Sequence, residues 1–237
     1  MKLVKEISVF FPAYNEAENI QATLSKANKV LKSVAEKFEI IVIDDGSRDA
    51  TADVVKNLMS SVNNLRLVTH VTNQGYGAAL KTGIKQSKFK LICYTDSDGQ
   101  FDFSEIEKFI AKIQDGADMV IGFRVNRTDT LYRRVMARLL KLAGTILFSL
   151  NVKDVDCGFK IFRRRIMENI GTLTTSSAIT ETELVARTKR EGYKIQQVGV
   201  KHHSRTDGEQ TGGKPSIVIK AALEGLKLWM SLTFSKS

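Results

Sequence analysis

The sequence has little proline, cysteine or tryptophan, with two Pro, two Cys and one Trp in 237 residues. Pro12 and Pro215 lie near the two ends, and no Pro- or Ser-rich linker divides the chain between them. Cys93 and Cys157 form no CxxC or Cys/His spacing, which excludes a disulfide framework or a zinc site and fits a reducing cytosol. We therefore expect one large domain with a C-terminal extension.

Long uncharged apolar runs are also missing. No segment approaches the roughly 20 apolar residues that a membrane-spanning helix needs. The N-terminus "MKLVKEISVFF" enters a strand-like run without a signal-peptide cleavage pattern. These absences predict a soluble or peripheral protein without a signal peptide or a transmembrane helix.

Acidic residues are outnumbered, since 26 Asp and Glu face 36 Lys and Arg, which gives a formal net charge of +10. Such an excess suits a polyanionic partner, whether a nucleic acid, a phosphorylated substrate or an anionic membrane surface. The basic residues concentrate after residue 120, whereas the organised acidic clusters lie mostly before it. A nucleic-acid-binding protein would leave those acidic clusters unexplained, so we expect no nucleic-acid partner.

Strand-like and helical patterns alternate four times in the first half of the chain. This alternation predicts an α/β domain whose mostly parallel central sheet is covered by helices on both faces. In the second half we expect a helix, a short strand with a basic turn, another helix, a last strand and an amphipathic C-terminal helix. The expected strands are 6–14, 38–47, 65–70, 89–98, 117–123, 157–162 and 193–200, and the expected helices are 15–37, 49–62, 75–87, 103–115, 130–150, 178–192 and 215–237.

Four polar clusters follow predicted strands. "PAYNE" comes after the first strand, "DDGS" after the second, "TDSDG" after the fourth and "GFR" after the fifth. Ligands of such sheets bind beyond the carboxyl ends of the strands, so the four clusters together predict a site.

Asp96 and Asp98 are two residues apart, and in an extended strand such side chains point to the same side. Two converging carboxylates need a counter-charge, and oxygen ligands favour Mg²⁺ or Mn²⁺. The spacing therefore predicts a divalent cation at this edge of the sheet.

The segments "FPAYNEAENI", "VIDDGSRDAT", "NQGYGAALKTGI" and "TDSDGQFD" resemble, in order and spacing, the motifs of family 2 glycosyltransferases of the GT-A fold. The resemblance extends from about Ile7 to Val200. "DVDCGFKIFRRR" and "SRTDGEQTGGK" are similar, more narrowly, to polyprenyl-phosphate glycosyltransferases of the dolichyl-phosphate and undecaprenyl-phosphate kinds. Together these resemblances imply a GT-A domain over 1–214, with a nucleotide-sugar half (1–123) and an acceptor half (124–214). The amphipathic helix 215–237 follows it.

The resemblance also implies roles for single residues on the donor side. The positions that match the nucleotide-sugar site are Pro12, Tyr14 and Glu16 for the base, Asp45 for the base and ribose, and Ser97 between the aspartates. Asp96 and Asp98 match the metal-binding DxD motif, with Gln100 as a further ligand.

Two arginines match positions that bind phosphates in the family. Arg124 resembles an arginine that contacts the phosphates of both donor and acceptor, and Arg138 resembles a second arginine that contacts the acceptor phosphate. By the same resemblance, Arg205 and Lys214 match positions in a loop that closes over the diphosphate. The spacing is longer in this sequence, so Lys214 is the weaker match. Asp98 and Arg124 are the residues expected to carry catalysis.

Two acceptors remain open. A sugar hydroxyl would need a general base, for which Glu181 or Glu183 could serve. A polyprenyl phosphate is already anionic and needs cations instead, which the basic second half favours. The implied donors are UDP-glucose first and GDP-mannose second, and a nucleotidyltransferase is disfavoured by the motifs.

A lipid acceptor implies a place at the cytoplasmic membrane face. The helices 131–150 and 215–237 pair apolar residues with Lys or Arg, as helices lying in the interface plane do. Trp229 and Phe234 suit the boundary between headgroups and tails. The sequence does not indicate an oligomeric state.

Overall fold

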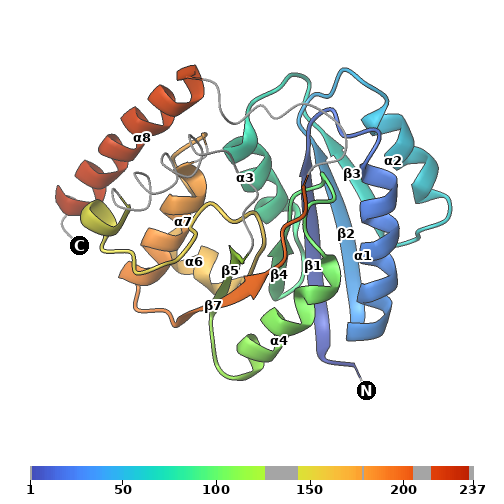
Figure 1. Ribbon diagram of the computed structural model, residues 1–237, viewed down its shortest axis with the longest axis horizontal. Coiled ribbons are helices and arrows are strands. Elements are labelled where there is room, and N and C mark those ends of the chain that lie inside the picture. Colours follow the sequence, from blue (N-terminus) through green and yellow to red (C-terminus); the bar gives the residue numbers. More distant parts are fainter. Residues whose placement is uncertain (1, 126–143, 178, 205–214, 235–237) are drawn as a thin grey trace.

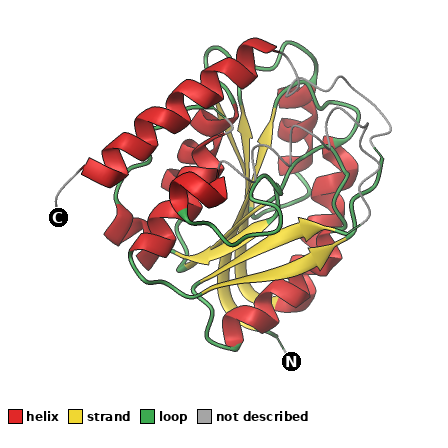
Figure 2. Cartoon of the chain, turned by 60° about the vertical axis from the view of Figure 1, so that its left-hand side comes forward, coloured by secondary structure: helices red, strands yellow, loops and turns green. Residues whose placement is uncertain are grey.

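The computed structural model describes residues 2–125, 144–177, 179–204 and 215–234. Seven strands of this part form one sheet in the order β3-β2-β1-β4-β6-β5-β7, with helices on both faces (Figures 1 and 2). The predicted α/β class with a mostly parallel sheet is therefore confirmed. The strands are β1 Val4–Ala13, β2 Ala35–Asp44, β3 Leu65–Thr69, β4 Leu91–Tyr94, β5 Met119–Arg124, β6 Lys160–Arg163 and β7 Ile195–Val200.

The helices bury their apolar residues in two clusters, one on each face of the sheet. One face carries α1, α2 and α4, and the other carries α3, α6 and α7, with α8 packed outside α7 (Figure 1). Among the described helices none is long and apolar enough to cross a membrane. The helices are α1 Ile20–Val34, α2 Thr51–Met59, α3 Tyr76–Gln86, α4 Ile106–Gln114, α6 Arg165–Ile170, α7 Ile179–Arg190 and α8 Pro215–Phe234, with a 3₁₀ turn at Phe103–Glu105 and helical residues at 144–148.

The strand register brings the predicted polar clusters to one edge. β1 pairs in parallel with β2, placing Ala13 opposite Asp44, and with β4, placing Phe10 opposite Tyr94. Each of these strands is almost entirely buried near its carboxyl end. The segments that follow the strands therefore leave a common edge, as the sequence predicted.

The first helix starts later than the sequence pattern indicates. Asn15 has a left-handed backbone with φ 56°, and the helix begins only at Ile20. The backbone N–H groups of Asn15 and Glu16 donate to side chains of the segment after β2, instead of entering a helix. Residues 15–19 are consequently part of the carboxyl edge.

β6 occupies a place that the sequence does not reveal. It runs antiparallel between β4 and β5, with Lys160 opposite Tyr94 on one side and Ile121 on the other. The predicted basic turn is present at Arg164, and the helix α6, which was not predicted from the sequence, begins at the next residue. Nε of Arg164 donates to the carbonyl of Phe89 at 3.0 Å.

Candidate active site

Two loops of the carboxyl edge are joined by hydrogen bonds. The backbone N–H of Asn15 donates to Oγ of Ser47 at 2.9 Å, and that of Glu16 donates to Oγ1 of Thr51 at 2.8 Å. The loop after β1, where Tyr14 is half-buried, is therefore fixed against the loop after β2.

The segment after β4 is bonded to the same surface. Oγ of Ser97 donates to the carbonyl of Pro12 at 2.8 Å, and Ser97 is buried. Oδ1 of Asp98 accepts from the backbone N–H of Gln100 at 3.0 Å, which closes a tight turn. Ser97 and Pro12 are thus brought together as supports of the loop that carries Asp96 and Asp98.

Asp96 is held from two sides. The hydroxyl of Tyr76 donates to its Oδ1 at 3.0 Å, and a Cβ at Gly158 would lie only 2.2 Å from its Oδ2. Burial, and then the neighbouring carboxylates of Asp98 and Glu181, raise the pKa of Asp96 to about 7. The raised pKa thus reflects first the burial of Asp96 and second the like charges beside it.

The neighbouring carboxylates of Asp96 and Asp98 fit a divalent cation. No group of three or more His, Cys, Asp or Glu side chains with metal-binding spacing occurs among the described residues. Mg²⁺ commonly takes only one or two protein carboxylates and fills its shell with water and substrate phosphates. Asp96 and Asp98 match that smaller set, so a cation here would be shared with a diphosphate.

Arg124 lies at the end of β5 in a two-pronged ion pair. Its Nε donates to Oδ2 of Asp154 at 2.7 Å, and its Nη2 donates to Oδ1 at 2.8 Å. Burial lowers the pKa of Arg124, but the hydrogen bonds and the charge of Asp154 outweigh it and raise that pKa. Asp154 was not predicted as a site residue, although "DVDCGF" places it just before the motif that contacts Asp96.

Asp45 is buried and organises the chain after β3. Its Oδ1 lies 2.6 Å from Nδ1 of His70 and accepts from the N–H of Gln74 at 3.0 Å, while Oδ2 accepts from the N–H of Gly75 at 2.8 Å. Asp45 thus fixes the glycine-containing turn that leads into α3. Its role near the base and ribose stays a prediction.

A buried ion pair lies on the sheet face below Asp96. Nζ of Lys160 donates to Oε1 of Glu181 at 2.6 Å, and the hydroxyl of Tyr94 donates to the same oxygen at 2.8 Å. Lys160 has 0% exposed surface. Burial raises the pKa of Glu181, against the lowering effect of Lys160 and Tyr94. This pair was not predicted from the sequence, although a lysine inside the apolar run "CGFKIF" indicates a buried charge that needs a partner.

Glu183 is bonded to the loop that precedes α7. Its carboxylate accepts from the backbone N–H and hydroxyl groups of Thr174 and Thr175 at 2.7–3.0 Å. Glu181 and Glu183 are both buried, with 4% and 0% of their surface exposed. The general-base role predicted for Glu181 or Glu183 stays a prediction.

Several predicted site residues lie outside the described part of the chain, namely Arg138, Arg205 and Lys214. The segment before Arg205 does reach the site. Nε2 of Gln100 donates to the carbonyl of His203 at 2.8 Å, and Phe101 pairs with His202. Residues 202–203 therefore lie beside the Asp98 loop.

Comparison with known proteins places these motifs in a family. Residues 8–171 match the family described as Glycosyl transferase family 2. The chain belongs to glycosyltransferase family 2. The match covers every loop of the carboxyl edge described above up to Gly158, and the resemblance read from the motifs is confirmed.

Two curated relatives in this family are sugar transferases named for an undecaprenyl-phosphate acceptor. An undecaprenyl-phosphate 4-deoxy-4-formamido-L-arabinose transferase of Pseudomonas fluorescens (strain Pf0-1) is 31% identical over 164 residues, 68% of this chain and 48% of that protein. The enzyme with the same description from Pseudomonas paraeruginosa is 32% identical over 164 residues, again 68% of this chain and 48% of that protein. This chain thus spans about half the length of the curated relatives it matches.

Solved structures support the fold. Glucosyl-3-phosphoglycerate synthase from Mycobacterium tuberculosis, solved with Mn²⁺ and UDP-glucose, aligns with a TM-score of 0.71 at 17% identity, covering 96% of this chain and 78% of that one. Its complex with phosphoglyceric acid aligns with a TM-score of 0.71 at 18% identity, covering 96% and 79%. The predicted GT-A fold of this family 2 glycosyltransferase is confirmed.

Proposed function

We propose that this protein transfers a hexose, with inversion and in a metal-dependent reaction, from a nucleotide-diphosphate sugar to a polyprenyl phosphate. The observation that carries the proposal is the meeting of Asp96, Asp98 and Arg124 at one sheet edge, in a family whose curated relatives are named undecaprenyl-phosphate sugar transferases. UDP-glucose is the first donor to test and GDP-mannose the second.

The carboxylates would hold the metal. Asp96 and Asp98, with Gln100 as a further ligand, would bind Mg²⁺ or Mn²⁺ together with the donor diphosphate. When bound, the cation supplies Lewis-acid stabilisation of the departing nucleoside diphosphate. Tyr14, Glu16 and the loops bonded to them would receive the base and ribose.

Arg124 would share the charge of the phosphates. Asp154 keeps its guanidinium ionised and oriented, so that it can face the leaving diphosphate and the incoming lipid phosphate. A phosphate oxygen attacks the anomeric carbon as the bond to the diphosphate breaks, which inverts the configuration. No general base is required, because the acceptor is already an anion.

An assay of labelled UDP-glucose with a polyprenyl phosphate tests this proposal. We expect EDTA to abolish transfer and Mn²⁺ to restore it, because diphosphate departure loses its Lewis acid without the metal. Asp98→Asn should lower the rate about 100-fold. The exposed Asp53→Asn on α2 is the matched control and should transfer normally. Turnover that is unaffected by EDTA, or transfer to sugar hydroxyls alone, would contradict the proposal.

The lipid acceptor implies contact with a membrane surface, and α8 offers one. Leu223, Leu226, Met230 and Phe234 are exposed on this helix, with Phe234 73% accessible. Trp229 packs edge-on against Phe234, with ring centroids 6.2 Å apart. Their apolar surface supports a peripheral attachment beside the acceptor site on the cytoplasmic face.

A further inference from the structure

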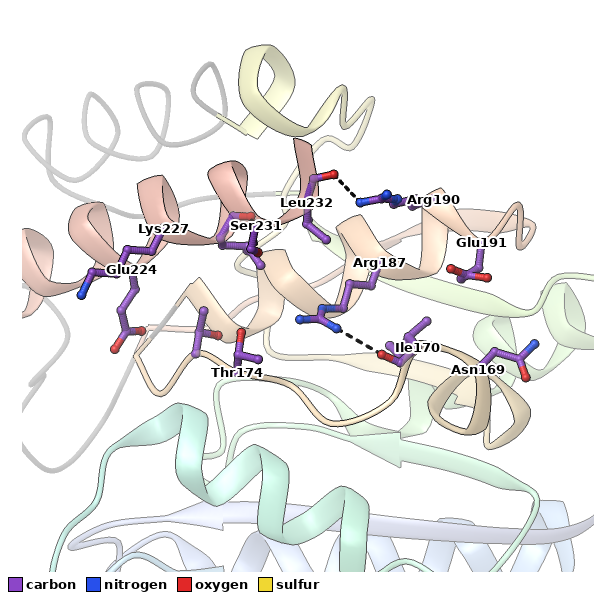
Figure 3. A pocket seen from close by; sticks show the side chains of 12 residues that line it. Asn169, Ile170, Thr174, Arg187, Arg190, Glu191, Glu224, Lys227, Ser231 and Leu232 are labelled. Atoms are coloured by element: carbon purple, nitrogen blue, oxygen red, sulfur yellow. Dashed lines mark hydrogen bonds between the residues drawn. The ribbon is translucent and has the colours of Figure 1, made fainter. Parts of the chain in front are cut away.

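The helix α8 is bonded to the loop that precedes α7. The carboxylate of Glu224 accepts hydrogen bonds from the backbone N–H and the hydroxyl of both Ser176 and Ser177, at 2.8–3.0 Å. Burial opposes these bonds, but they keep the pKa of Glu224 below its usual value. Figure 3 shows the Glu224 carboxylate directed from α8 toward the loop that carries Thr174. The contact is therefore specific and depends on one side chain.

The same loop and the first turn of α7 lie against the start of α3. A Cβ at Gly77 would lie 2.2 Å from Oγ1 of Thr180 and 2.6 Å from the carbonyl carbon of Ser176. The carbonyl oxygen of Ser176 would also lie 3.4 Å from a Cβ at Gly75. Only glycine at position 77 allows this approach, so the loop and the first turn of α3 are in direct backbone contact.

The first residue of α3 reaches the metal-binding edge. Tyr76 lies between Gly75 and Gly77, and its hydroxyl donates to Oδ1 of Asp96 at 3.0 Å. A continuous path of contacts thus runs from Glu224, through Ser176 and the first turn of α3, to Asp96.

We propose that Glu224 and Tyr76 are positioning residues through which α8 orients the carboxylate of Asp96 for the metal. This inference rests on the proposed metal site. A ligating carboxylate needs a fixed orientation, and the partners that orient ligands affect metal affinity strongly. The hydroxyl of Tyr76 fixes Oδ1, while the close approach of Gly158 restricts the rotation of the group.

The loop that precedes α7 is also held by Glu183, so Glu224 can be replaced without releasing the whole loop. Glu183 binds the preceding residues Thr174 and Thr175 independently of α8. The loop should therefore remain folded when Glu224 is replaced, while Ser176 and Ser177 lose their partner.

The test is the binding of Mn²⁺ to the full chain in the presence of UDP, which supplies the diphosphate. Binding is measured as the loss of the electron paramagnetic resonance signal of unbound Mn²⁺, relative to UDP without protein. We expect Tyr76→Phe and Glu224→Ala each to weaken Mn²⁺ binding about tenfold, with Glu224→Gln in between. The double variant Tyr76→Phe/Glu224→Ala should be no weaker than the weaker single variant, because both act along one path.

Matched controls are available on the same chain. Tyr193→Phe removes a hydrogen-bonded hydroxyl far from Asp96, and Lys227→Ala changes the exposed side chain one turn after Glu224. Both should bind Mn²⁺ like the natural sequence.

The outcomes separate this inference from the proposed function. Binding by the natural sequence that Asp98→Asn abolishes supports the metal site, and absence of such binding overturns both proposals. If the site binds Mn²⁺ but Tyr76→Phe and Glu224→Ala bind equally well, the positioning role is wrong and the metal site stands. If only Tyr76→Phe weakens binding, or if the two effects add, the link to α8 is wrong.

Discussion

Glu183 is a single side chain whose ionisation stabilises the fold. Its bonds to Thr174 and Thr175 outweigh burial and lower its pKa in the folded protein. We expect Glu183→Gln to cost about 2 kcal/mol of unfolding free energy at pH 7. Because the folded pKa lies below the unfolded value of about 4.3, this contribution is complete above pH 4.3 and is lost as the pH falls through the folded pKa.

Urea unfolding at pH 7, 5 and 3 measures this effect. The difference between Glu183→Gln and the natural sequence should persist at pH 5 and shrink at pH 3. The exposed Glu191→Gln should differ little at any of these pH values. An equal difference at pH 3 and pH 7 would show that the carboxylate charge plays no part.

At this scale the sequence indicates candidate ligands but not the residues that hold them. The spacing of Asp96 and Asp98 predicted two ligands in a strand, whereas β4 ends at Tyr94 and both residues follow it; their metal role stays a prediction. Tyr76 could not be predicted, since its hydroxyl meets Asp96 only after α3 and β4 have packed. The same holds for Asp154, whose partner Arg124 is 30 positions away along the chain.

Two glycines within helices show how packing overrides helix propensity. A Cβ at Gly83 of α3 would lie 2.2 Å from the ring of Phe10, whereas one at Gly225 of α8 would make an ordinary 3.4 Å contact with Ile179. Alanine favours a helix by about 1 kcal/mol over glycine. We expect Gly225→Ala to be neutral or stabilising by up to that amount, and Gly83→Ala to destabilise by about 1–3 kcal/mol.

Chemical unfolding of the two variants checks this prediction, and each serves as the control for the other. Gly83→Ala should have the lower midpoint in urea without a change in slope. If both variants gain stability alike, the close contact between α3 and β1 does not exist as described.

Helices and strands could be predicted from the sequence where elements that follow one another in the chain also pack against one another. The alternation of strands and helices up to Arg124 was read correctly, although α1 starts at Ile20 because the segment before it bonds to the loop after β2. The position of β6 was not predictable, since hydrophobic pattern does not say which strands pair. The helix α6 was not predicted, because the three arginines at 163–165 indicated a turn. Only Arg164 lies in that turn, and Arg165 already begins the helix.

Across the whole molecule, charge and the apolar surface of α8 act together. We expect the protein to float with anionic vesicles at 0.1 M salt and to dissociate largely at 0.5 M, because the net charge of +10 is then screened. Replacing Leu223, Leu226 and Phe234 by Gln should reduce flotation even at low salt.

Val71→Gln is the control for flotation, because Val71 is 98% exposed but lies on the loop after β3. This variant should float like the natural sequence. If the intact protein stays in the soluble fraction, or the α8 variant floats equally well, α8 is not the membrane contact.

The strand order has a consequence for synthesis on the ribosome. β4 and β5 never pair with each other, and the strand that joins them ends only at Arg163. At about 5–20 residues per second, the nascent chain spends a few seconds with these two hydrophobic strands made but their shared partner missing. Open strand edges of this kind pair readily with other chains. We therefore expect nascent chains that stall before Arg163 to aggregate more readily than chains that extend past it.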